Sequence, residues 1–306
     1  MKHWIQAARL RTLPLSVSGI LVGSFYAFAN QPNAISEMIN WVILFLSLST
    51  TLGFQVLSNF ANDYGDGVKG TDNEHRIGPM RAIQSGKISV GAMKKAIIIT
   101  SILTLISASL LIYFAFKNTN FVYSLFFLLL GIVAIIAAVK YTVGDSAYGY
   151  KGFGDVFVFI FFGLVSTLGV NFLYSKNIDL QLILPACAIG LLSVGVLNLN
   201  NMRDEVSDRN SNKNTIVVKI GGEKAKIYHY FLIITPMILM LIFALFYNGT
   251  GFKIFQYVFI VTYFPLIIHI RRVYFCKEPR SLDPELKKLA ISTFLVSIIL
   301  SIVMLF

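Results

Sequence analysis

The sequence has little charge and almost no cysteine. Only 13% of its 306 residues are charged, and only 15 are acidic. Cys187 and Cys276 are the only cysteines, so no disulfide framework or cysteine-based metal site is expected. The chain contains neither GxxxxGK[ST] nor GxSxG, the signatures of phosphate-binding loops and of serine hydrolases. These absences exclude the common templates of soluble enzymes.

Apolar residues are abundant, at 56% of the chain with a mean hydropathy of +0.71. A helix needs roughly 17–25 apolar residues to cross a bilayer. Nine runs without Asp, Glu, Lys or Arg meet this need, the eighth only just. They are 12–36, 38–62, 96–116, 118–139, 156–175, 180–202, 227–252, 254–270 and 289–306. The sequence therefore predicts an all-α integral membrane protein with nine transmembrane helices. No linker rich in Gly, Ser or Pro divides it, so residues 1–306 are expected to form a single domain.

The basic residues are distributed unevenly along the chain. If the N-terminus is cytoplasmic, 23 of the 26 Lys and Arg residues fall in cytoplasmic segments, and only Lys117, Lys176 and Lys253 fall outside. This positive-inside asymmetry predicts a cytoplasmic N-terminus and an outer C-terminus. The net charge of +11 is then explained by topology in a lipid bilayer. Nucleic-acid binding is not needed to explain it.

Two acidic, Asn-rich segments follow the second and sixth apolar runs on the predicted cytoplasmic side. They are Asn59-Phe-Ala-Asn-Asp-Tyr-Gly-Asp66 and Asn198-Leu-Asn-Asn-Met-Arg-Asp-Glu-Val-Ser-Asp208. With Asp72 and Glu74, they hold seven of the 15 acidic residues. Their matching positions indicate a weak internal duplication with both copies in the same orientation.

Helical spacing places the polar residues of each segment on one face. The first stripe holds Asn59, Asn62, Asp63 and Asp66, and the second holds Asn201, Asp204 or Glu205, and Asp208. Oxygen ligands near hydrocarbon suit Mg²⁺, which takes one or two carboxylates together with phosphate oxygens. Pairing of the carboxylates with neighbouring cations at the headgroup level is the alternative. Nearby cations that could hold phosphates are Lys69, Arg76, Arg81, Lys151, Arg203 and Lys213.

These motifs resemble the UbiA superfamily of intramembrane prenyltransferases. The resemblance rests on Asn62-Asp63-x-x-Asp66 and Asp204-x-x-x-Asp208, and extends over nearly the whole chain. Further stretches resemble the branch that prenylates 1,4-dihydroxy-2-naphthoate: 11–16, 78–86, 148–159, and 200–204 with 213–215. The wider pattern has another Asp four residues after Asp66, where this chain has Gly70, with Asp72 two residues further on. The naphthoate branch shares that shift, so the resemblance does not assign Asp72 as a ligand.

The resemblance implies a reaction and roles for these residues. A polyprenyl group would pass from an all-trans polyprenyl diphosphate to 1,4-dihydroxy-2-naphthoate, with loss of carbon dioxide and diphosphate, giving demethylmenaquinol. Asn62, Asp66, Asp204 and Asp208 would coordinate one or two Mg²⁺, with Asp63 and Asn59 as alternates. Lys69, Arg76, Lys151, Arg203 and Lys213 would hold the diphosphate, and Arg81 or Lys151 the naphthoate carboxylate. Tyr141, Tyr148 and Tyr150, in the third cytoplasmic loop, could offer π faces to a prenyl cation. The enzyme would sit in the bacterial inner membrane, with its active site facing the cytoplasm.

Two groups of alternatives remain open. The acceptor could instead be 4-hydroxybenzoate, homogentisate or haem, because acceptor choice depends on the shape of the pocket. From another class, a secondary transporter also combines parallel repeats with intramembrane polar residues. A transporter more often places its acidic residues at mid-span near Gly or Pro breaks. Here they lie at span ends, away from Pro185, Pro236 and Pro265.

Overall fold

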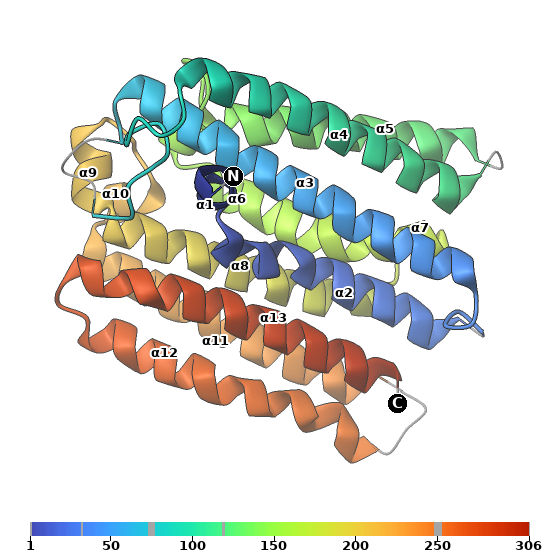
Figure 1. Ribbon diagram of the computed structural model, residues 1–306. Coiled ribbons are helices and arrows are strands. Elements are labelled where there is room, and N and C mark those ends of the chain that lie inside the picture. Colours follow the sequence, from blue (N-terminus) through green and yellow to red (C-terminus); the bar gives the residue numbers. More distant parts are fainter. Residues whose placement is uncertain (1, 32, 73–76, 118–119, 248–252, 306) are drawn as a thin grey trace.

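The computed structural model describes residues 2–31, 33–72, 77–117, 120–247 and 253–305. The regular structure in these ranges is entirely helical (Figure 1). Nine described segments are long and apolar enough to cross a membrane. They are Lys2–Asn30, Met38–Lys69, Val90–Phe116, Phe121–Lys140, Gly154–Ser175, Leu180–Arg203, Gly222–Phe246, Phe255–Phe275 and Pro279–Leu305. The predicted fold class and number of spans are confirmed.

Five spans are built from more than one helical piece. The first comprises α1 (Lys2–Ala8), η1 (Leu10–Thr12) and α2 (Leu13–Asn30), and the fifth comprises α6 (Gly154–Val158), η3 (Phe159–Gly169) and α7 (Val170–Ser175). The sixth joins η4 (Leu180–Leu182) to α8 (Ile183–Arg203), and the eighth joins η5 (Lys253–Thr262) to α12 (Tyr263–Phe275). The ninth joins η6 (Pro279–Leu282) to α13 (Asp283–Leu305). The other spans are the single helices α3 (Met38–Lys69), α4 (Val90–Phe116), α5 (Phe121–Lys140) and α11 (Gly222–Phe246). Short helices η2 (Tyr148–Lys151), α9 (Glu205–Asn210) and α10 (Ile216–Ile220) lie in the loops.

The long helices run side by side (Figure 1). α3, α4 and α5 form one side of the bundle, α11, α12 and α13 form the other, and α2 and α8 lie between them. α8 packs against α11 and η3, and α13 packs against α2. The C-terminal ends of α3 and α8 lie at the same end of the bundle, beside α9 and α10. Both acidic segments are therefore brought to one end.

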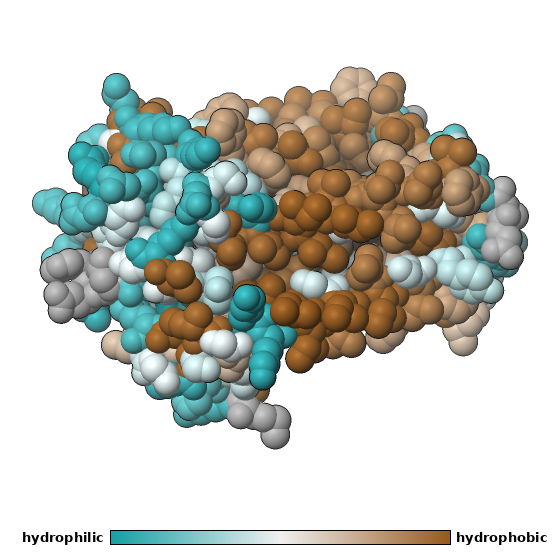
Figure 2. Space-filling view, turned by 90° about the horizontal axis from the view of Figure 1, so that it is seen from above, coloured by the Kyte–Doolittle hydropathy of each residue, from teal (hydrophilic) through white to brown (hydrophobic). Residues whose placement is uncertain are grey.

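The surface separates by polarity along the bundle axis. In Figure 2 a broad hydrophobic band covers most of the visible face, and hydrophilic side chains gather at the end that carries the polar loops. α4 and α5 contribute strongly exposed apolar side chains, among them Ile99, Leu103 and Phe126. Such a band is stable only in contact with lipid. The chain is a multi-pass membrane protein.

The second acidic segment is not one continuous helix. α8 ends at Arg203, and Asp204, with φ −98° and ψ 9°, separates it from α9. The expected unbroken stripe of Asn201, Asp204 and Asp208 is therefore wrong in this detail. Adjacent residues of a helix point in different directions, yet the Arg203 guanidinium contacts both carboxylate oxygens of Asp204, at 2.9 and 2.6 Å. The departure from helical geometry at Asp204 allows these two neighbouring side chains to pair.

The fifth span contains a π-helix, η3. π-helical turns are rare and are often found at functional sites. Gly163 of η3 lies directly against α8, where an added Cβ would be 2.7 Å from both the Ala186 carbonyl oxygen and the Gly190 Cα. A uniformly apolar run does not reveal such an irregularity, so the π-helix could not be predicted from the sequence.

Gly163→Ala should therefore destabilise the protein, by about 1–3 kcal/mol, because its methyl group would press on backbone atoms that cannot yield easily. Gly169→Ala is the matched control in the same π-helix, since its nearest neighbours would be at 3.8 and 3.9 Å. Thermal unfolding in detergent measures both variants. Equal melting temperatures would contradict the close packing of η3 on α8.

Candidate active site

The first acidic segment forms the last turns of α3. Asn59, Asn62 and Asp66 line a large cavity. Asp63 is turned toward the loop that follows α3, where its Oδ2 accepts a hydrogen bond from the Ala82 backbone at 3.2 Å. Asn59 is held by Ala8, whose carbonyl accepts from its Nδ2 at 2.9 Å. Asn62 and Asp66 are therefore the residues of this segment best placed for a ligand.

Gly65 explains how the α5–η2 loop reaches this segment. A Cβ at Gly65 would lie 2.5 Å from Thr142 Oγ1, so only glycine allows the loop to come so close. Thr142 then donates to the Ala61 carbonyl oxygen at 2.9 Å and approaches Asn62 Oδ1 at 3.3 Å. The loop thus fixes the orientation of the Asn62 amide.

The second acidic segment contains a fully buried arginine. Arg203 is 0% exposed, and its guanidinium contacts Asp204, Asn200 Oδ1 and Asp283 of α13. Gly78 packs on its outer face, where a Cβ would lie 2.6 Å from Nη2. Arg203 is not among the residues that line the two cavities described below. It joins α8 to α13 from behind the acidic residues.

Asp66, Asp208 and Lys213 converge in a small polar pocket between the two segments. Lys213 Nζ lies 3.2 Å from Asp208 Oδ1, and the Tyr150 hydroxyl donates to Asp66 Oδ1 at 2.8 Å. The pocket is lined by Asp66, Thr71, Asp72, Arg81, Asn200, Asp204, Ser207, Asp208 and Lys213. The two halves of the chain thus meet as the duplicated motifs predicted.

Burial shapes the electrostatics of this pocket. Burial raises the pKa of Asp208 to about 6; Lys213 opposes this effect, and Asp204 reinforces it. Burial also disfavours the charged form of Lys213, but Asp208 and Asp66 outweigh it, and the pKa of Lys213 is raised. The ammonium therefore stays charged among crowded, poorly solvated carboxylates.

The donor set of this pocket fits Mg²⁺. Carboxylate and amide oxygens are the protein ligands that magnesium prefers. Asp208 Oδ2 is buried and has no hydrogen-bond partner among the described residues, which leaves an acceptor available for a cation. In the part of the chain that the structure describes, no three His, Cys, Asp or Glu side chains could hold a metal by themselves. Asp66 and Asp208 would thus need further oxygens from water or from a bound phosphate.

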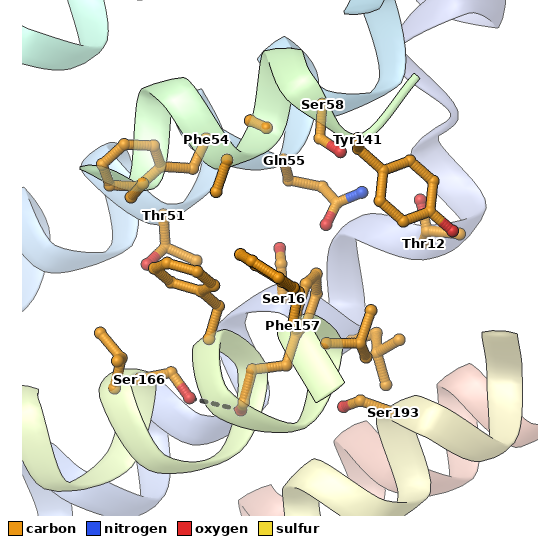
Figure 3. Close-up of a pocket in the computed structure, with 18 of the residues that line it drawn as sticks. Thr12, Ser16, Thr51, Phe54, Gln55, Ser58, Tyr141, Phe157, Ser166 and Ser193 are labelled. Atoms are coloured by element: carbon orange, nitrogen blue, oxygen red, sulfur yellow. Dashed lines mark hydrogen bonds between the residues drawn. The ribbon is translucent and has the colours of Figure 1, made fainter. Parts of the chain in front are cut away.

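A larger, mainly apolar cavity of about 340 Å³ adjoins the polar pocket. It shares Asp66, Arg81, Asn200 and Lys213 with that pocket and continues between α2, α3, α4, α5 and the fifth span. Aromatic rings form part of its wall, among them Tyr141 and Phe157 (Figure 3). Tyr148 stacks on Phe157 at 3.9 Å between ring centroids and meets Tyr141 edge-on at 5.3 Å. A ligand with a charged head and a long apolar tail would fit this combined space.

The remaining predicted residues are distributed around the two cavities. Arg81 lines both, with Nε 3.8 Å from Asp72 Oδ2, and Tyr141 and Tyr148 line the larger one. Lys69 is exposed, with Nζ 4.1 Å from the Tyr150 ring centroid. Lys151 is exposed as well and is not among the lining residues. Arg76 lies outside the described residues.

Asn200, Thr71 and Ser207 also line the polar pocket, although the sequence motifs do not identify them as site residues. From the sequence, Tyr150 is expected only to offer a π face, whereas its hydroxyl contacts Asp66 and Thr71. The position of Asn200 in the second Asn-rich segment was a signal that could have identified it. Thr71 and Ser207 belong to no such motif. Threonine and serine are common residues, and only the folded structure shows that these two line the pocket.

The sequence pattern of the UbiA prenyltransferase family matches residues 16–302. The chain belongs to this family, as its motifs indicated, and this decides against the transporter interpretation. A 1,4-dihydroxy-2-naphthoate octaprenyltransferase of Haemophilus influenzae is 39% identical over 302 residues, covering 99% of this chain and 95% of the relative. One from Escherichia coli is 43% identical over 244 residues, covering 79% and 76%.

Solved structures of similar fold are more distant in sequence. A UbiA homologue from Archaeoglobus fulgidus, bound to DMAPP and Mg²⁺, has a TM-score of 0.65 at 16% identity, covering 98% of this chain and 99% of that one. A homologue from Aeropyrum pernix has a TM-score of 0.67 at 15% identity, covering 96% and 97%. At these identities the likeness establishes the fold alone.

Arg203→Met should cost about 3–5 kcal/mol of stability, because it leaves the carboxylates of Asp204 and Asp283 without their buried partner. Arg203→Lys should recover only part of the loss, since an ammonium cannot bind a carboxylate through two nitrogens. Unfolding in detergent by heat or denaturant measures the effect. Unchanged stability with weaker diphosphate binding would instead support direct contact between Arg203 and a substrate.

Proposed function

We propose that this protein transfers a polyprenyl group from an all-trans polyprenyl diphosphate to 1,4-dihydroxy-2-naphthoate, forming demethylmenaquinol. The observation that carries this proposal is the junction of the polar pocket with the aromatic-lined apolar cavity. The naphthoate octaprenyltransferases of H. influenzae and E. coli support the choice of acceptor. The positive-inside charge pattern supports an active site on the cytoplasmic side of a bacterial inner membrane.

The polar pocket would hold the diphosphate. Asp66 and Asp208 would hold Mg²⁺, with Asn62, Asn200 and Asp204 close by. The bound metal would act as a Lewis acid that neutralises charge on the phosphate oxygens. Lys213, kept charged by its carboxylate neighbours, would hold the leaving diphosphate from within the pocket. Arg81, which lines both cavities, would face the naphthoate carboxylate.

The reaction balances without a general base. The allylic C–O bond breaks and its electron pair leaves on the diphosphate, while the electron-rich naphthol ring donates a pair to the prenyl carbon. When the prenyl group enters at the carbon that bears the carboxylate, that group leaves as carbon dioxide and its bonding pair restores the aromatic ring. The charge of the carboxylate departs on the diphosphate, so no ring proton has to be removed.

The reconstituted protein with Mg²⁺, a prenyl diphosphate and 1,4-dihydroxy-2-naphthoate should release diphosphate and form a decarboxylated, prenylated product. Chelation of the metal should stop both. Parallel assays with 4-hydroxybenzoate and homogentisate test the acceptor. Faster turnover of either compound would overturn the choice of naphthoate, and diphosphate release without any acceptor would argue against aromatic prenylation.

Asp208→Asn should lower kcat/KM by about 100-fold or more. The substitution removes the negative charge of a carboxylate that would bind the metal cation beside the leaving diphosphate. Asp63→Asn is the matched control: Asp63 faces the Ala82 backbone, and its amide analogue can still accept that hydrogen bond. A loss below about tenfold is expected there. Initial rates of product formation across a Mg²⁺ titration make the comparison. Equal losses in the two variants would contradict the assignment of Asp208 to the metal.

A further inference from the structure

The Gln55 side chain carries an unpaired acceptor that faces the larger cavity. Gln55 lies on α3, one turn before Asn59, and only 9% of it is exposed. Its Oε1 is buried and has no hydrogen-bond partner among the described residues. An amide oxygen left in this state costs about 1–3 kcal/mol. A ligand that supplies a donor would recover this cost.

Neighbouring contacts determine which atom of the amide is unpaired. Asn59 donates its Nδ2 to the Ala8 carbonyl, so Asn59 must present Oδ1 toward Gln55. Gln55 then donates its own Nε2 to that oxygen, at 3.3 Å. A flipped Gln55 amide would set two carbonyl oxygens against each other. The hydrogen bonds that run from Ala8 through Asn59 to Gln55 thus direct the carbonyl group of Gln55 at the cavity.

The surroundings suit a flat, hydroxylated ring. Gln55, Ser58 and Tyr141 line the same part of the cavity, and Figure 3 shows the Gln55 amide pointing into it on the side of Tyr141. Phe157 contributes a further aromatic ring to the lining. Of the two proposed substrates, the prenyl chain carries no donor, and the diphosphate carries only acceptors when ionised. Only the hydroxyl groups of the aromatic acceptor can pair with Oε1.

We propose that Gln55 accepts a hydrogen bond from the 4-hydroxyl group of the naphthoate and so selects acceptors that carry it. The proposal rests on the function proposed above. The 1-hydroxyl group lies beside the carboxylate and is already hydrogen-bonded to it within the molecule, which leaves the 4-hydroxyl as the free donor. Gln55 is therefore a specificity-determining residue that recognises the ring edge away from the carboxylate.

The test compares two ligands on two proteins. Dissociation constants of 1,4-dihydroxy-2-naphthoate and of 1-hydroxy-2-naphthoate, which lacks the 4-hydroxyl group, are measured with Mg²⁺ and an uncleavable thiolo-diphosphate analogue of the donor. The wild type should prefer the dihydroxy compound by about tenfold. Gln55→Met, of similar length and volume, should reduce this preference to within about twofold, with Gln55→Leu as a second variant. Binding of the donor analogue should not change.

Ser49→Ala is the control, because Ser49 lies on the same helix but does not line the cavity, and its hydroxyl donates to the Phe45 carbonyl. It should keep the full preference. Equal affinity of the wild type for the two naphthoates, or an undiminished preference in the Gln55 variants, would overturn the role of Gln55. These outcomes are distinct from failure of the proposed function, in which the wild type would form no prenylated naphthoate at all.

Discussion

Carboxylates held away from water at the end of an apolar cavity are the constraint on which this structure depends. Asp66 and Asp208 are 5% and 2% exposed, and such groups are costly unless a cation compensates them. Lys213 provides part of that compensation, and its own burial makes its charge more effective. The negative charge that Lys213 leaves uncompensated suits the pocket to a metal cation that is bound together with a diphosphate. The apolar cavity can then begin directly at Asp66.

Polar contacts behind the pocket hold the second acidic segment in place. Arg203 connects α8 to Asp283 of α13, and Arg11 reaches the same carboxylate at 3.4 Å. A second connection runs through buried side chains of four helices: Asn198 to His229 at 3.4 Å, His229 to His269 at 2.9 Å, and His269 to Glu285 at 2.8 Å.

One set of neutral tautomers satisfies this second connection. His269 donates from Nδ1 to Glu285, so its Nε2 accepts from His229, whose Nδ1 in turn accepts from Asn198. Each hydrogen bond then has a defined donor and acceptor. The series ends on the Glu285 carboxylate, which Arg272 and Lys288 neutralise at the surface. Interhelical hydrogen bonds of this kind fix the rotation of helices in a bilayer. They set the direction in which Asn200 and Asp204 face.

The features that could be predicted from the sequence were those with a regular residue spacing and those with a high free-energy cost in a bilayer. Uncharged runs gave the spans, because a charge at mid-bilayer is expensive. The spacing of Asn62, Asp66 and Asp208 predicted a shared polar site, because such a cluster needs a ligand. Asp63 follows the same spacing, yet its contact with Ala82 depends on the path of a loop. The roles of Arg203, Tyr150 and Gln55 likewise depend on which side chains the tertiary fold places beside them. Local pattern carries no information about these partners.

The tyrosines of the cavity wall illustrate why burial matters as much as the composition of the polar pocket. A prenyl cation formed beside Tyr141 and Tyr148 would be captured by any phenolate within reach. Burial raises the pKa of Tyr141 to about 12 and raises that of Tyr148 as well, so both remain neutral phenols near neutral pH. A neutral phenol is a weak nucleophile, but its ring still offers a π face to a cation. The low polarity of the wall therefore leaves the naphthol ring as the strongest nucleophile in the cavity, which is what a selective transfer to carbon requires.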